Sequence, residues 1–374
     1  MAQELRVLLA AGGTGGHLFP AYALAQELRR REAVVDLVTD MRGDRYGSDF
    51  PARSIHQISS ATLVSKAPTQ IARTGWMLSK GIGSALKLLG EIAPDVVVGF
   101  GGYPAFPPLV AAKLRGIRTM VHEQNAVLGR TNRLLARRVD IIATSFEQVK
   151  FVDERDADKV RLTGSPVRDQ VIQAAERPYW APMDGDAVQI LIFGGSQGAR
   201  YFSDAIPPAL ALLPPEVRSR LSVVQQAREE DVERVRAAYQ ASGIAAEVAS
   251  FFGDLPDLMA RSHLVIARAG ASTVAELTVI GRPSILVPLP HALDNDQLHN
   301  ATRLAQAGAC WCFEQDKLTP EVWGREIGTL IASTTHLVQA AHAAKQLGRP
   351  DAVARLADVV AELATRREDL AHGA

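Results

Sequence analysis

Four glycine-rich stretches have the composition of phosphate-binding turns. They are GGTGGH at 12–17, GFGGYP at 99–104, GGSQGAR at 194–200 and RAGAST at 268–273. Each follows a short apolar run, so each is expected where a buried strand turns into a helix. Free N–H groups at the start of a helix attract an anion, and glycine lets the backbone approach it. One such turn is weak evidence, but four of them, two in each half, favour a reaction whose two substrates both carry phosphates.

None of the four turns matches the two common nucleotide-binding signatures. The absence of G-x-G-x-x-G argues against a dinucleotide-dependent dehydrogenase, in which Asp40 would be the ribose acid. The absence of G-x-x-x-x-G-K-[ST] argues against a P-loop enzyme. The phosphate sites must therefore be of another class.

Titratable and polar side chains lie next to these turns. His17 closes the first turn, where a histidine tends to stay neutral and can act as a general base, or can simply cap the loop. His122, Glu123, Gln124 and Asn125 follow an apolar run, and four polar residues at a strand end favour a site over a purely structural role. No second cluster has metal-ligand spacing, so no metal is expected.

The fourth turn opens the segment ARAGASTVAE, residues 267–276. A helix starting near Ser272 would present bare amides to a phosphate, and Glu276, about one turn later, could accept hydrogen bonds from ribose hydroxyls. Glu276 is equally an ordinary first-turn acid favoured by the helix dipole. The polar loop PLPHALDNDQLHNA at 288–301 has a composition suited to binding sugar hydroxyls, although surface loops are often polar as well.

Parallel sheets are predicted to position these residues. Apolar, β-rich runs alternate with helix-length amphipathic stretches, which indicates α/β domains of the doubly wound, Rossmann-like type. The predicted strands are 6–11, 34–39, 95–100, 119–122, 141–144, 189–193, 221–224, 263–267 and 284–287. Gly12 and Gly194 open two similar strand–turn–helix units, which favours two tandem domains.

The domain boundaries follow from proline positions and from this repeat. We expect an N-terminal domain at 1–166 and a C-terminal domain at 167–347, with 161–187 as the linker. Residues 351–366 read as one amphipathic helix.

Composition fits an ordinary globular protein of 374 residues, 47% of them hydrophobic. Lys plus Arg and Asp plus Glu both total 41, so no overall charge recruits nucleic acid. Cys310 and Cys312 are too close for a plausible structural disulfide, and no signal peptide or membrane span is apparent. A reducing cytoplasm is the expected setting.

The segment Pro68–Leu89 is predicted to be an amphipathic helix with an unusual outer face. Ile71, Leu78, Ile82, Ala85 and Leu89 form the stripe expected to face the core. Opposite them lie Arg73, Lys80 and Lys87, flanked by Trp76, Met77 and Leu88. Basic residues beside exposed aromatic ones suit an anionic membrane surface, while a solvated face explains the lysines equally well.

Taken together, these motifs resemble the MurG family of bacterial peptidoglycan glycosyltransferases. The matching strings are GGTGGH, GFGGYPAFPP, HEQNAVLGRTN, GSPVR, GGSQGAR, RAGASTVAE and DQLHNA, spread in the right order from residue 12 to residue 301. Two features depart from the family: Ser165 stands where asparagine is commoner, and the loop PHALDND at 290–296 is one residue longer than in some relatives.

The resemblance implies a GT-B fold, in which two Rossmann-like domains face each other across a deep cleft. The N-terminal domain would hold the acceptor, the C-terminal domain would hold UDP-N-acetylglucosamine, and the helix at 351–366 would pack back on the first domain. In this interpretation His17 is the catalytic base, and Thr14, Gly15 and Gly16 face the acceptor diphosphate together with the loop 101–103.

The resemblance also assigns the remaining binding residues. Ser196 and the amides of Ala271, Ser272 and Thr273 would meet the donor phosphates, with Val274, Ala275 and Glu276 completing the segment and Glu276 binding the ribose. Phe252 would read the uracil through its main chain, Arg168 would contact the nucleotide, and Asn125 and Gln297 would hold the transferred sugar.

The implied activity is inverting transfer of N-acetylglucosamine to the 4-hydroxyl of the muramyl sugar of undecaprenyl-diphosphate-linked muramyl-pentapeptide, with no metal or other cofactor. The implied location is the cytoplasmic face of the inner membrane, with Pro68–Leu89 on the anionic surface. The alternatives are another GT-B enzyme, either a UDP-sugar epimerase or a glycolipid synthase, and a non-catalytic nucleotide-sugar sensor.

Overall fold

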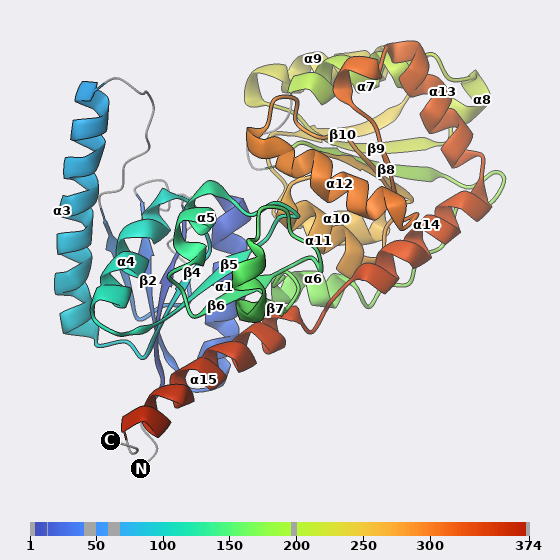
Figure 1. Ribbon diagram of the computed structural model, residues 1–374. Helices are drawn as coiled ribbons and strands as arrows, with labels where there is room; N and C mark the ends of the chain where they lie inside the picture. Colours follow the sequence, from blue (N-terminus) through green and yellow to red (C-terminus); the bar gives the residue numbers. More distant parts are fainter. Residues whose placement is uncertain (1–3, 13, 41–49, 59–67, 196–199, 372–374) are drawn as a thin grey trace. The chain divides into compact units, whose positions relative to one another are not determined.

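The computed structural model describes residues 4–12, 14–40, 50–58, 68–195 and 200–371. The chain divides into two compact units. Unit 1 contains residues 1–168 and 350–374, and unit 2 contains residues 169–349. The chain therefore passes between the units twice, after Arg168 and after Arg349 (Figure 1).

Within the described residues, unit 1 is built on a seven-stranded parallel sheet in the order β3-β2-β1-β4-β5-β6-β7. The strands are β1 (Arg6–Ala10), β2 (Val34–Thr39), β3 (Ser54–Gln57), β4 (Val96–Gly99), β5 (Arg118–Glu123), β6 (Ile141–Thr144) and β7 (Val160–Leu162). Its helices are α1 (Gly15–Arg30), α3 (Pro68–Ile92), α4 (Phe106–Leu114), α5 (Arg130–Ala136) and α15 (Ala352–Ala371).

Helices cover both faces of this sheet because its strands are apolar on both sides. Val7 and Leu9 of β1 belong to one buried cluster, which includes α1 and α15. Leu8 and Ala10 of the same strand belong to the other cluster, which includes α3, α4 and α5. Alternate side chains of a strand point to opposite faces, so a continuous apolar run is the pattern of a strand buried on both sides.

The helix α15 completes unit 1 although it follows unit 2 in the sequence. Its side chains Leu356, Ala357, Val360 and Leu363 are buried in the same cluster as α1. Arg31, just after α1, donates hydrogen bonds to the Asp358 carboxylate at 2.6 Å and to the Ala354 carbonyl at 3.3 Å.

The described part of unit 2 has a six-stranded parallel sheet in the order β10-β9-β8-β11-β12-β13. The strands are β8 (Val188–Phe193), β9 (Leu221–Gln226), β10 (Ala245–Ala249), β11 (Leu264–Ala267), β12 (Ser284–Leu286) and β13 (Cys310–Cys312). The helices are α6 (Asp169–Ala174), α7 (Arg200–Ala211), α8 (Pro215–Arg218), α9 (Val232–Ala241), α10 (Leu255–Arg261), α11 (Ala271–Ile280), α12 (Asp296–Gln306), α13 (Pro320–Ile331) and α14 (Thr334–Leu347).

Both sheets share one topology. In each, the first strand lies at the centre, the next two extend to one side, and the following strands extend to the other side. The strand order therefore reverses between β1 and β4 in unit 1, and between β8 and β11 in unit 2. Ligands of doubly wound sheets bind at the carboxyl ends of the strands flanking such a reversal. All four glycine-rich turns follow these four strands.

Two sequence-based expectations need correction. The predicted strands omitted β3, β7, β10 and β13, which are the outer strands of the two sheets. The predicted linker 161–187 is also partly structured, because its first residues pair with β6 as β7 and residues 169–174 form α6.

Candidate functional site

The reversal point of unit 1 places His17 against the glycines of two turns. The Thr14 hydroxyl lies 3.0 Å from Nδ1 of His17. A Cβ atom added at Gly101 would lie 3.1 Å from Nε2 of His17, and one added at Gly12 would lie 3.2 Å from Nδ1. Gly101 has φ +92° and Gly102 has φ +73°, so glycine is required there both for conformation and for close approach to the imidazole.

The motif HEQN, which spans the end of β5, has a different role from the one predicted for all four residues. His122, Glu123 and Gln124 are buried, and only Asn125 is partly exposed. His122 Nε2 lies 2.9 Å from the Gly164 carbonyl and therefore donates to it, which leaves Nδ1 to accept from the Gln124 amide at 3.0 Å. Burial lowers the pKa of His122 to about 4, so this ring is neutral. These buried side chains therefore support the backbone at the carboxyl end of the sheet.

Glu123 holds this part of the backbone through several hydrogen bonds. Its carboxylate accepts hydrogen bonds from Asn125 N at 3.0 Å, Asn125 Nδ2 at 3.2 Å, Gly129 N at 2.7 Å and Asn132 Nδ2 at 2.9 Å. Burial raises the pKa of Glu123, and these four donors act in the opposite direction. The Asn132 amide also lies 3.7 Å from the Cβ position of Gly101, so Glu123 connects Asn125 to the surroundings of His17.

Arg168 lies beside the first turn of α1. Its guanidinium carbon is 4.3 Å from the centre of the Phe19 ring, a cation–π contact. Phe19 in turn lies against Gly15, where an added Cβ would meet the ring at 3.1 Å. Gly15 is buried and Gly16 is exposed, at the start of α1.

The reversal point of unit 2 places an uncapped helix N-terminus after β11. The first hydrogen bond of α11 runs from Val274 N to Gly270 O at 3.0 Å, so the amides of Ala271, Ser272 and Thr273 precede it. Gly270 supplies no side-chain cap, and the buried Ser272 hydroxyl has no hydrogen-bond partner among the described residues. Val274 and Glu276 are buried, and Ala275 is half-buried. The positive end of the α11 dipole is thus available to an anion.

Two residues not singled out from the sequence hold this turn. Asn300 is buried and donates to the Ala269 carbonyl at 3.1 Å. Arg268 is 7% exposed and donates to the carbonyls of Val287 and Pro288, both at 3.1 Å, and to Gln315 Oε1 at 2.6 Å. Burial lowers the pKa of Arg268. Both residues lie inside quoted motifs, and the available signal for Arg268 was a large polar residue directly after an apolar strand.

Gln297 and the loop before it follow β12, at the carboxyl end of the unit 2 sheet. Gln297 Oε1 accepts a hydrogen bond from Leu289 N at 3.0 Å, so part of its amide fixes the loop. The loop contains His291, Asp294 and Asn295, non-glycine residues with φ of 57°, 58° and 52°. Such conformations persist only where the surroundings enforce them.

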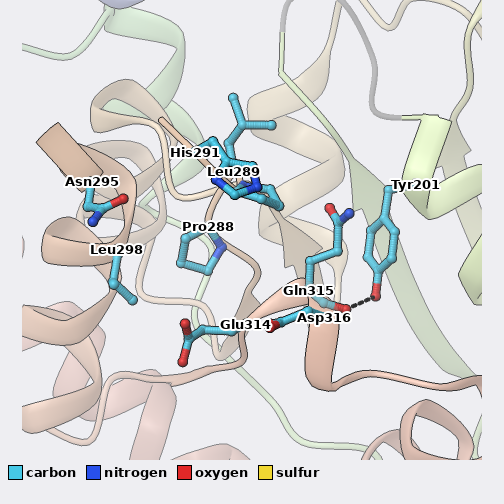
Figure 2. Close-up of a pocket in the computed structure, with 10 residues that line it drawn as sticks. Tyr201, Pro288, Leu289, His291, Asn295, Leu298, Glu314, Gln315 and Asp316 are labelled. Carbon is cyan, nitrogen blue, oxygen red and sulfur yellow. Dashed lines mark hydrogen bonds between the residues drawn. The ribbon is translucent and has the colours of Figure 1, made fainter. Parts of the chain in front are cut away.

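A pocket of about 470 Å³ opens beside this loop (Figure 2). Its lining combines prolines and leucines with polar and charged side chains, and consists of Tyr201, Pro288, Leu289, Pro290, His291, Asn295, Leu298, Glu314, Gln315 and Asp316. Figure 2 also shows Tyr201 donating to the Gln315 carbonyl, at 3.4 Å.

Other predicted residues have simpler outcomes. Phe252 follows β10 and is half-buried, while its neighbour Phe251 is 76% exposed. Ser196 lies outside the described residues. Over the described ranges, no group of three or more His, Cys, Asp or Glu side chains is placed to hold a metal ion.

The helix α3 has the predicted amphipathic character, with one correction. Ala85 and Leu89 are buried, and Trp76 is 66% exposed, with Lys80 Nζ 5.6 Å from its ring centre. Leu88, expected on the outer face, packs partly buried against the unit 1 core, because it is the i+3 neighbour of the buried Ala85 on the same side of the helix. The side chains of Ile71 and Arg73 lie outside the described set. No helix in the described parts of the chain is long and apolar enough to cross a membrane.

Two family models match this chain, in the order of its two units. Residues 7–144 match the glycosyltransferase family 28 N-terminal domain, and residues 189–356 match the glycosyltransferase family 28 C-terminal domain.

Individual relatives match over nearly the whole length. A protein of Mesorhizobium japonicum named UDP-N-acetylglucosamine–N-acetylmuramyl-(pentapeptide) pyrophosphoryl-undecaprenol N-acetylglucosamine transferase is 50% identical, over 96% of each chain. The crystal structure of Acinetobacter baumannii MurG superposes with a TM-score of 0.78 at 31% identity, covering 96% of this chain and 99% of that one. A UDP-GlcNAc 2-epimerase of Neisseria meningitidis, solved bound to UDP-GlcNAc, has a TM-score of 0.65 at 15% identity, covering 97% and 100%, which shows a shared fold alone.

Proposed function

Because this chain belongs to glycosyltransferase family 28, with MurG relatives along its whole length and their GT-B fold, we infer that it transfers N-acetylglucosamine from UDP-N-acetylglucosamine to lipid-linked muramyl-pentapeptide. The acceptor is the N-acetylmuramyl-(pentapeptide) pyrophosphoryl-undecaprenol named for the relatives, and the reaction is a step of peptidoglycan synthesis. The observation that carries the site assignment is the bare N-terminus of α11 at the reversal point of the second sheet.

The donor is assigned to unit 2. The amides of Ala271, Ser272 and Thr273 and the Ser272 hydroxyl bind its diphosphate. Ser196 of the motif GGSQGAR, outside the described residues, is assigned to the same diphosphate on its sequence alone. Val274 and Ala275 continue this first turn, and Glu276 accepts the ribose hydroxyls. Phe252 reads the uracil through its backbone, and Gln297 holds the transferred sugar. Two residues of unit 1 complete the assignment, with Arg168 contacting the nucleotide and Asn125 the transferred sugar.

The acceptor is assigned to unit 1. Thr14, Gly15 and Gly16 at the start of α1 face the acceptor diphosphate, together with the turn at Gly101 and Gly102. Gly12 and Gly101 lie close to the His17 imidazole, and the acceptor hydroxyl is assigned next to this ring. His17 lies in the first turn of α1 and is assigned as the general base.

The chemistry is a direct displacement. The 4-hydroxyl oxygen of the muramyl sugar attacks the anomeric carbon of the donor while the bond from that carbon to the diphosphate oxygen breaks, which inverts the anomeric configuration. The hydroxyl proton passes to His17, and the electron pair of the broken bond leaves with UDP. Preorganised amides stabilise the charge that develops on the departing diphosphate.

The helix α3 is assigned to the membrane surface, with the enzyme as a peripheral protein on its cytoplasmic face. Trp76, Lys80 and Lys87 are exposed together on one side of α3, and Lys87 is 83% exposed. An aromatic ring beside ammonium groups suits the headgroup region of an anionic bilayer.

A transfer assay tests the whole assignment. Labelled UDP-N-acetylglucosamine is incubated with a short-chain analogue of the lipid-linked muramyl-pentapeptide, and labelled disaccharide product is expected only when the acceptor is present. Conversion of the sugar nucleotide without acceptor would indicate an epimerase. Binding of UDP-N-acetylglucosamine with no product would indicate a sensor.

A further inference from the structure

Both chain crossings between the units attach to the same helix of unit 2. The first crossing, after Arg168, leads directly into α6, which packs against α10 and α11. The second crossing follows Gly348 and Arg349 at the end of α14, which also packs against α11. These attachments lie at the C-terminal end of α11, opposite the end assigned to the donor.

Arg282 fixes the segment after α6 to this end. It is 1% exposed, and all its hydrogen bonds go to carbonyl oxygens, namely those of Arg177, Pro178, Ala260, Ile280 and Gly281 at 2.6 to 3.4 Å. It also lies over the Tyr179 ring, 5.5 Å from its centre. Because Arg177 and Pro178 belong to the segment after α6 and Ile280 to α11, one side chain joins the two.

Lys345 fixes α14 to the same place. Its ammonium donates to the carbonyl of Val279 at 2.8 Å and to that of Ala175 at 3.1 Å. Val279 is in the last turn of α11, and Ala175 directly follows α6. Lys345 of α14 therefore binds both α11 and the segment that follows α6.

Gly348 brings the second crossing into contact with the α11 backbone. A Cβ added there would lie 2.5 Å from the Thr278 carbonyl oxygen and 3.0 Å from the Val279 Cα. The φ of Gly348 is −62°, which any residue can adopt. Glycine is therefore required here because the α11 backbone lies so close. Any larger residue would have to move α14 away from α11.

We propose that Arg282, Lys345 and Gly348 are positioning residues that make α11 a rigid connector between the donor diphosphate and both interdomain crossings. This inference rests on the donor assignment in the proposed function. A ten-residue helix is about 15 Å long, so a shift of its N-terminus on a diphosphate is carried to its C-terminal end as a rigid-body movement. Donor binding thereby biases the positions that unit 1 can adopt.

The experiment measures the response of the two units to UDP. Spin labels are attached through Asp158→Cys in unit 1 and Glu216→Cys in unit 2, in a Cys312→Ser background, and the distance distribution is recorded by pulsed electron spin resonance with and without UDP. UDP affinity is measured by calorimetry on the same proteins. The test variants are Lys345→Met and Gly348→Ala, and the controls are Arg325→Met on the exposed face of α13 and Gly83→Ala, where an added Cβ meets nothing within 4 Å.

UDP should change the distance distribution in the parent and in both controls. In Lys345→Met and Gly348→Ala the UDP dissociation constant should stay within about threefold, because the phosphate amides are intact, while most of the distance response is lost. Turnover should fall about tenfold, which corresponds to about 1.4 kcal/mol of transition-state stabilisation. Lys345→Arg should restore part of the response.

Two results would overturn this inference while leaving the donor assignment in place. One is a parent protein that binds UDP without any change in distance, and the other is a full response in both folded variants. A parent protein that does not bind UDP overturns the donor assignment and the inference together. Should one variant fail to fold, the other and Lys345→Arg decide.

Discussion

The Thr14 hydroxyl and the His17 Nδ1 lie 3.0 Å apart, with Thr14 at the N-cap of α1 and His17 in its first turn. When Nδ1–H donates to the hydroxyl, Nε2 is the nitrogen that accepts a proton, and it is also the nitrogen facing Gly101. In that tautomer the Thr14 hydroxyl orients the imidazole, with Nε2 as its basic nitrogen. A general base that is oriented by a neighbouring polar group is a common catalytic arrangement.

Substitutions at this pair should separate the base from the group that orients it. His17→Ala should lower turnover by about 100-fold, in the range for loss of a general base. Thr14→Val keeps the shape but removes the hydroxyl, so it should lower turnover by a smaller factor and leave the KM for the donor unchanged. The measurement is steady-state transfer at several pH values. Near-normal turnover in His17→Ala would remove the histidine from this role.

Glu276→Ala should chiefly weaken nucleotide binding. Its carboxylate is 5% exposed in the second turn of α11 and is assigned to the ribose hydroxyls. Losing a charge-assisted hydrogen bond costs about 1.5–3 kcal/mol, so UDP affinity should fall by about ten- to a hundredfold. Calorimetry with UDP measures this directly. Glu247→Ala, on the outer strand β10, is the matched control, and equal affinities in the two variants would refute the ribose contact.

His122 should make the protein sensitive to mild acid. Its folded pKa of about 4 lies below the ordinary 6.5, so the unfolded chain takes up a proton first as the pH falls. The neutral ring stabilises the fold fully above pH 6.5, and this contribution of about 3 kcal/mol is lost progressively as the pH falls from 6.5 toward 4. Urea unfolding at pH 7.5, 6 and 5 measures the loss.

A variant comparison isolates the contribution of this one ring. The pKa of the neighbouring Glu123 is raised by burial, so its effect has the opposite sign. His122→Gln should be less stable at pH 7.5 but should lose less stability between pH 7.5 and pH 5 than the parent. His336→Gln, at an exposed position of α14, should follow the parent. Parallel curves for the parent and His122→Gln would contradict the prediction.

Charge reversal on α3 should weaken membrane binding. Each basic residue near an anionic surface contributes about 1 kcal/mol, so Lys80→Glu and Lys87→Glu together should lower the partition coefficient by at least about twentyfold. Sedimentation with phosphatidylglycerol vesicles at low and high salt gives the measurement. Lys317→Glu in unit 2 is the control. Equal binding of this control and the double variant would place the docking surface elsewhere.

The strands that could be predicted from the sequence are those with side chains buried on both faces. Leu8, Leu9 and Ala10 are fully buried, and such continuous apolar runs are distinctive. The outer strands β3 (SIHQ) and β10 (AAEVA) are largely exposed and carry polar residues, so their sequences resemble those of loops. Only pairing with a neighbouring strand makes them strands, and pairing is not visible in local sequence.

The candidate site likewise contains residues whose role could be predicted from the sequence and residues whose role could not. The glycine turns and the α11 motif were predictable because bare amides after a strand have a sequence signature. The role of the motif HEQN was not predictable, because a polar residue at a strand end can either face a ligand or form hydrogen bonds with the protein backbone. His122 and Glu123 do the latter, through Gly164 and Gly129, and Gly164 is 42 residues from His122, so only the fold brings that pair together.

The position of α15 has a consequence for how the protein is made. Residues 169–349 form unit 2 from one continuous segment, so this half can fold as soon as it leaves the ribosome. Most of unit 1 precedes unit 2 in the chain but lacks Leu356, Val360 and Leu363 until all of unit 2 has been synthesised, and burying each such side chain is worth about 1.5–3 kcal/mol. The half that is synthesised first is therefore the half that matures last, and during that interval the apolar side of α1 is a surface for chaperones to shield.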